Sequence, residues 1–155
     1  MELESIKTIL FCLTLLVLLY NIFFKKKSNQ LPQLFLLSSA FITTLLILVI
    51  ELEIHHLLRA GFGIPNTVTY ILIVIPICIY FYKFRNIILN SNFLLIIMSL
   101  VFIGFALLLD LLTDAKILIM SSSDYIEEIL RIAGAFFWLL YYIFYSFRLK
   151  RIKWY

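Results

Sequence analysis

One stretch constrains the fold of this chain more than any other. The eighteen residues 33–50, QLFLLSSAFITTLLILVI, contain no charged side chain. An α-helix needs about 20 mostly apolar residues to cross the hydrocarbon core of a bilayer, so this stretch is typical of a membrane span. Apolar runs of similar length recur along the chain. The predicted spans are 6–24, 33–58, 67–83, 92–112 and 125–147.

The composition supports a membrane environment. Hydrophobic residues make up 64% of the 155 residues and charged residues only 14%, whereas soluble domains are about half apolar and a quarter charged. A chain of this length cannot bury such an excess in an aqueous core. The fold class is therefore predicted to be an all-α integral membrane protein, a bundle of five transmembrane helices forming a single membrane domain over residues 1–155.

Local signals place the ends of two predicted helices. Pro32 suits the first turn of the second span. That helix is expected to continue through residues 51–59, ELEIHHLLR, to Gly61 as its C-cap. Asp124 with Glu127 three residues later resembles a capping box and predicts the start of the fifth span.

Basic residues give the orientation. With five spans, nine of the 13 Lys and Arg residues fall on one side, which the positive-inside rule makes cytoplasmic. The N-terminus is then outside and the C-terminus cytoplasmic, in a plasma or bacterial inner membrane, or alternatively an organellar inner membrane. This inner rim is expected to contact anionic lipid headgroups rather than nucleic acid. Its residues are Lys25, Lys26, Lys27, Lys83, Arg85, Arg148, Lys150, Arg151 and Lys153.

All nine acids and both histidines fall on the opposite side, together with Lys7, Arg59, Lys116 and Arg131. Ten of these residues, which lie near the ends of three spans, form what we call the outer polar cluster. Helical i, i+4 spacing aligns several of them on common faces, and charged groups in a bilayer favour the bundle interior. The outer polar cluster consists of Glu51, Glu53, His55, His56, Arg59, Asp110, Asp114, Glu127, Glu128 and Arg131.

A structural ion pair is the favoured interpretation of this cluster. Arg131 lies about two turns inside the fifth span, and Asp110 ends an uninterrupted apolar run. Pairing of Arg131 with Asp110 or with Glu127 would neutralise the charge and fix the helix packing.

A metal site is one alternative. Glu53-x-x-His56 has the Glu/His spacing of di-iron carboxylate bundles, although the chain has one copy where those bundles have two. Asp110 and Glu127 could complete a mononuclear site with Glu53 and His56. No other cofactor is predicted.

Two further alternatives use the same cluster. Imidazoles beside carboxylates could handle protons or cations in a transporter or channel component, but no ionisable residue continues a relay through the inner half of any span. Separately, Glu127-Glu128 followed by Arg131 resembles the paired-glutamate motif of some intramembrane proteases, and the resemblance implies water activation by a glutamate. It covers about five residues, and the macrodipole also favours Glu-Glu at a helix N-terminus.

The fifth span is rich in aromatic residues that cover its whole circumference, so most are expected to face lipid or a partner. They are Phe136, Phe137, Trp138, Tyr141, Tyr142 and Tyr145. Small residues at 133–135 and at 38–44 permit close helix contact, either between the second and fifth spans or with another chain.

These features favour a small non-catalytic membrane protein, a subunit or a sensory or interaction module of a larger membrane assembly. The expected partners are the lipid bilayer and either further copies of the chain or other membrane subunits. A metal-binding protein or hydrolase, and a proton or cation transporter component, are the alternative functions.

Overall fold

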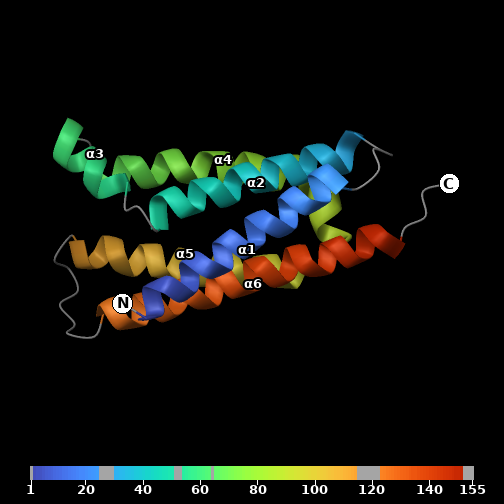
Figure 1. The fold of residues 1–155 in the computed structure, drawn as a ribbon. Coiled ribbons are helices and arrows are strands. Elements are labelled where there is room, and N and C mark those ends of the chain that lie inside the picture. Colours follow the sequence, from blue (N-terminus) through green and yellow to red (C-terminus); the bar gives the residue numbers. More distant parts are fainter. Residues whose placement is uncertain (1, 25–29, 51–53, 64, 115–122, 152–155) are drawn as a thin grey trace.

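The computed structural model describes residues 2–24, 30–50, 54–63, 65–114 and 123–151. Within these ranges the chain is all-helical, with six α-helices and no strand (Figure 1). Five helices are long and apolar enough to cross a membrane, and α3 is too short. The helices are α1 Glu2–Phe24, α2 Gln30–Ile50, α3 Ile54–Phe62, α4 Asn66–Leu89, α5 Phe93–Asp114 and α6 Ser123–Arg151.

The expected helix over 33–58 corresponds to two elements of the structure, one on each side of residues 51–53. The structure has α2 ending at Ile50 and a separate helix, α3, beginning at Ile54, while residues 51–53 lie outside the described ranges. Helix α3 ends two residues later than expected. Gly63, not Gly61, adopts the left-handed conformation, with φ 67°, and donates its N–H to the Arg59 carbonyl at 3.0 Å.

The third span is longer than the sequence suggested. Helix α4 continues to Leu89, so Lys83 and Arg85 lie within its last two turns and not in a loop. Both are exposed, and long basic side chains can reach an interface from inside a helix end. A tight turn at Asn90–Asn92 then leads into α5, and Ser91 donates its N–H to the Ile88 carbonyl at 3.0 Å.

Helix α6 organises the bundle. It packs along α5 on one side and α1 on another, α2 packs on α1, and α4 lies beside α2 (Figure 1). The beginning of α6 and the end of α5 share one end of the bundle, which we call the outer end. The ends of α4 and α6 share the opposite, inner end.

The packing corrects the interpretation of the aromatic residues on α6. Trp138, Tyr141 and Tyr142 are fully buried and Tyr145 is 7% exposed, whereas Phe136 is 46% exposed. These side chains face the protein because neighbouring helices surround α6 on several sides. Sequence periodicity could not show this, since lipid and a helix neighbour select equally apolar residues.

The contact between α5 and α6 is close enough to require a glycine. A Cβ built on Gly134 would lie 2.5 Å from Ile103 Cγ1 and 3.2 Å from the Ser99 carbonyl oxygen. Ser99 also donates its hydroxyl to the Gly134 carbonyl at 2.7 Å. Gly134 therefore serves a close contact with α5, whereas the sequence suggested a contact with α2 or with another chain.

Candidate functional site

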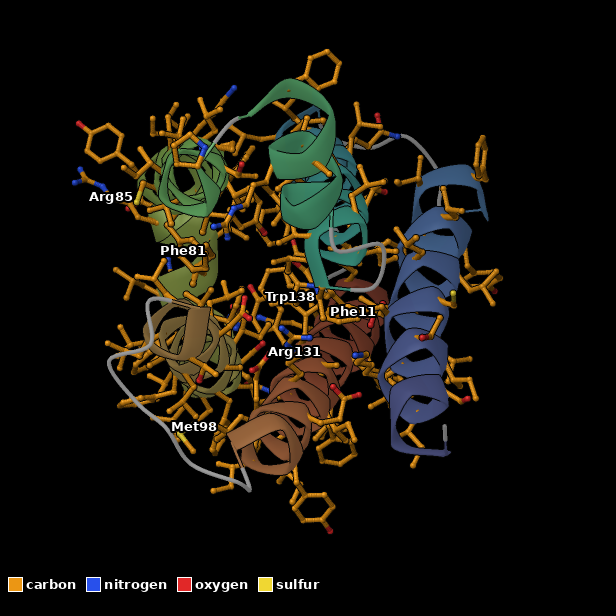
Figure 2. All side chains as sticks on the ribbon, turned by 90° about the vertical axis from the view of Figure 1, so that its left-hand side faces the viewer. Phe11, Phe81, Arg85, Met98, Arg131 and Trp138 are labelled. Atoms are coloured by element: carbon orange, nitrogen blue, oxygen red, sulfur yellow. The ribbon has the colours of Figure 1, made fainter. Side chains whose placement is uncertain are left out.

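Arg131 places a positive charge inside the outer end of the bundle. It lies eight residues into α6, about 12 Å along the axis, and only 6% of its surface is exposed. Figure 2 shows it directed toward the middle of the bundle. Its guanidinium pairs with the carboxylate of Glu127, one turn earlier on the same helix. This is one of the two ion pairs that the sequence suggested.

A second buried pair connects two helices. Lys7 on α1 donates to the Glu128 carboxylate on α6 at 2.9 Å, and the two side chains are 7% and 14% exposed. The sequence interpretation placed Lys7 at the outer face but gave it no partner. The position of Lys7 just inside an apolar run could have predicted a partner, because a charge there is stable only if it contacts protein or water.

The two pairs leave some buried polar atoms unmatched. Nε of Arg131 and Oε1 of Glu128 have no hydrogen-bond partner in the described part of the chain. A guanidinium carries five N–H donors and a carboxylate about four acceptor positions, so one ion pair does not saturate either group. What the arrangement does chemically is to neutralise charge and hold α6 against α1.

The structure describes only some of the other side chains of the outer polar cluster. Asp110 is half-buried on α5, and Arg59 is exposed on α3. Glu51 and Glu53 lie outside the described residues. His55, His56 and Asp114 belong to helices, but their side chains also lie outside what is described.

The metal site stays a prediction for the same reason. Of its four residues, Glu53 and the His56 side chain are not described, and Glu127 is already paired with Arg131. Among the described residues, no group of three or more His, Cys, Asp or Glu side chains could hold a metal ion.

The inner end carries basic side chains. Lys83, Arg85 and Arg148 are exposed there, and Arg148 donates to the Asn90 carbonyl in the turn between α4 and α5. Lys25, Lys26, Lys27 and Lys153 lie outside the described residues, as do the side chains of Lys150 and Arg151. Lys83, Arg85 and Arg148 thus lie near the ends of α4 and α6, opposite the beginning of α6 that carries Arg131 (Figure 1).

A hydroxyl network that the sequence did not reveal lies between these ends. Ser39 on α2 hydrogen-bonds to Tyr80 on α4 at 2.8 Å, and Tyr80 to Tyr142 on α6 at 3.1 Å. Trp138 donates its indole N–H to the Thr43 hydroxyl at 3.0 Å. Because buried polar groups need partners in an apolar environment, this network fixes how α2, α4 and α6 are rotated against each other.

The Trp138–Thr43 hydrogen bond gives a testable coupling. Trp138→Phe keeps an aromatic ring but removes the donor, and Thr43→Val removes the acceptor. In a double-mutant cycle measured by unfolding in detergent, the two changes should couple by about 0.5–1.5 kcal/mol, the range for hydrogen bonds between membrane helices. Thr44→Val is the control, since the Thr44 hydroxyl donates to the Ala40 carbonyl of its own helix at 2.9 Å. Strict additivity of Trp138→Phe and Thr43→Val would contradict the network.

Fold and site together define a class: a helical bundle with five candidate membrane spans, buried ion pairs near one end and exposed bases at the other. Within that class, the chain belongs to the family described as a domain of unknown function, DUF8692, whose model matches residues 4–144. No curated protein and no solved structure matches the chain.

Proposed function

We propose that the chain spans a membrane through α1, α2, α4, α5 and α6 and acts as a non-catalytic subunit or interaction module of a larger membrane assembly. Membrane insertion is supported by the length and apolar character of these five helices and by the many large hydrophobic side chains exposed on their flanks. The N-terminus is outside and the C-terminus cytoplasmic, because the described exposed bases of the inner end follow the positive-inside rule.

The outer polar cluster serves the bundle itself in this proposal. Two of its glutamates are engaged with cations, Glu127 with Arg131 and Glu128 with Lys7. A carboxylate held in an ion pair is already engaged with a cation and is poorly placed to activate a water molecule. This favours a structural role over hydrolysis for the pair that resembles the protease motif.

The observation that carries the assembly proposal is Gly104, in the middle of α5. A glycine inside a helix costs about 0.5–1 kcal/mol relative to alanine. At Gly134 on α6, the close contact with α5 accounts for the glycine. Gly104 has no such explanation within the described chain, because nothing lies within 4 Å of a Cβ built there. Its neighbours on the same exposed face are Leu94, Ile97, Val101, Phe105 and Leu108.

A glycine on an exposed apolar face allows the backbone of another helix to approach closely. The partner is therefore a transmembrane helix of a second copy or of another subunit, packed on α5. Two differently tagged copies distinguish these cases, because co-purification of the second tag in mild detergent identifies a homo-oligomer.

The test compares two enlargements of the same face of α5. Gly104→Leu should reduce recovery of the partner at least tenfold, because the added side chain separates the two backbones. Leu94→Phe adds bulk ten residues away, about 15 Å along the helix, and should leave recovery within twofold. Recovery that Gly104→Leu does not change, or a chain that stays single under membrane cross-linking, would contradict the proposal.

A further inference from the structure

A groove of ≈ 640 Å³ opens on the flank of the bundle between α2 and α4. It lies away from the outer polar cluster and from the exposed face of α5. Its walls include Ala40, Phe41 and Thr44 of α2 and Pro76, Ile79 and Lys83 of α4.

The groove exists because small side chains meet there. Ala40 and Thr44 leave room on α2 that larger residues would fill, and Pro76 presents a compact ring on α4. Two of the hydroxyls near the groove are already used: Thr44 donates to the Ala40 carbonyl at 2.9 Å, and Tyr80 turns its hydroxyl inward to Ser39 and Tyr142. The remaining hydroxyl on the walls is that of Ser38. Apart from Ser38, the walls therefore offer an apolar surface that suits an acyl chain.

One end of the groove carries a positive charge. Lys83 is exposed, and its ammonium group lies 5.7 Å from the centroid of the Phe84 ring. Phe84 is buried and also lines the groove, so this contact holds the charge at the groove. Pro76 and Lys83 are seven residues apart, which makes this apolar wall about 10 Å long.

Arg85 provides an internal comparison. It is exposed, two residues from Lys83, and its guanidinium lies 5.6 Å from the Tyr82 ring centroid. Figure 2 shows it on the side of α4 away from α2. It therefore brings the same charge to the same end of α4 without lining the groove.

We propose that this groove binds one anionic glycerophospholipid, with an acyl chain along its apolar walls and the headgroup phosphate at Lys83. Charge complementarity and the mostly apolar walls select this occupant, since a zwitterionic headgroup offers the ammonium group less net attraction. The inference rests on the proposed insertion into a membrane, but not on the proposed partner at Gly104.

The experiment titrates the purified chain in detergent with phosphatidylglycerol or phosphatidylcholine and counts bound lipids by native mass spectrometry. The wild-type chain should retain one phosphatidylglycerol in preference to phosphatidylcholine. Lys83→Gln should weaken phosphatidylglycerol binding about fivefold, which corresponds to the attraction of one basic side chain to anionic lipid. Arg85→Gln should change it less than twofold.

A second variant tests the acyl site separately from the charge. Ala40→Trp fills the groove and should abolish retention of the single phosphatidylglycerol. Gly104→Trp, which adds the same side chain in open space on α5, should leave retention unchanged. Circular dichroism and thermal unfolding establish that each variant keeps its fold.

Three outcomes would overturn the inference. Equal losses in Lys83→Gln and Arg85→Gln would indicate diffuse attraction to a basic rim. Unchanged retention in folded Ala40→Trp would place the lipid elsewhere, and equal binding of the two lipids by the wild-type chain would remove the role of charge. Failure of the partner experiment affects none of these readings, because lipid is counted on the isolated chain, and alkaline extraction of membranes tests insertion independently.

Discussion

Gly134→Ala is expected to lower the free energy of unfolding by about 1–3 kcal/mol, the usual cost of overpacking a close contact. The new Cβ would lie 2.5 Å from Ile103 Cγ1 and 3.2 Å from two backbone atoms of α5, the Ile103 nitrogen and the Ser99 oxygen. The side-chain carbon can move, but the backbone atoms move only if the helices separate. Separation would also lengthen the 2.7 Å hydrogen bond from Ser99 to the Gly134 carbonyl. Gly134→Leu should be worse and prevent the folded bundle from being purified.

Gly104→Ala is the matched control for this measurement. Both glycines lie inside long helices, but a Cβ at Gly104 meets nothing within 4 Å. In the isolated chain this change should be neutral or stabilise by up to about 1 kcal/mol, because alanine is the better helix former. Reversible unfolding in mixed detergent micelles, followed by circular dichroism, measures both variants. Equal effects of the two alanines would show that α5 and α6 do not approach as closely as the structure has them.

The contrast between these glycines shows what the sequence could and could not provide. The sequence indicated that small residues at 133–135 would permit a close helix contact, and that expectation is confirmed at Gly134. The sequence did not identify α5 as the neighbouring helix, because a glycine indicates a close contact but not which helix makes it. Gly104 lies among larger apolar residues in the sequence, and only the structure shows that it faces open space on α5.

The five long helices were predictable because an apolar run of about 20 residues has few alternatives to a span. Their ends were less so. Lys83 and Arg85 suggested a loop, yet α4 continues to Leu89 with both side chains exposed. Charge marks where a helix meets water, not where the helix ends, because long basic side chains extend along the helix toward the interface.

Contacts between helices depend on how each helix is rotated about its axis, and a single sequence does not specify these rotations. The Glu127–Arg131 pair was predictable, since i, i+4 spacing on one helix fixes the geometry. The Lys7–Glu128 pair and the Ser39–Tyr80–Tyr142 network join residues far apart in the chain. Both follow only after α1, α2 and α4 are placed around α6.

Arg131→Met is expected to destabilise the bundle by about 3 kcal/mol, near the lower end of the cost of breaking a buried ion pair. Methionine fills a similar volume with an apolar side chain, so little of the loss comes from a cavity. The loss comes instead from Glu127, whose carboxylate is 12% exposed and would lose the cation that it contacts. Arg85→Met, which removes an exposed arginine from α4, should change the free energy of unfolding in detergent by less than about 0.5 kcal/mol.

The double variant Glu127→Gln with Arg131→Met distinguishes the loss of the ion pair from the cost of leaving one buried charge behind. Replacing both charges removes the carboxylate that lost its cation, so stability should return to within about 1 kcal/mol of wild type, as it does when buried pairs elsewhere are replaced by neutral residues. Glu127→Gln alone leaves the buried guanidinium, already without a partner at Nε, and should be at least as damaging as Arg131→Met. If the double variant is as unstable as either single one, Arg131 does not act through Glu127, and the structural account of the outer polar cluster fails at its best-defined pair.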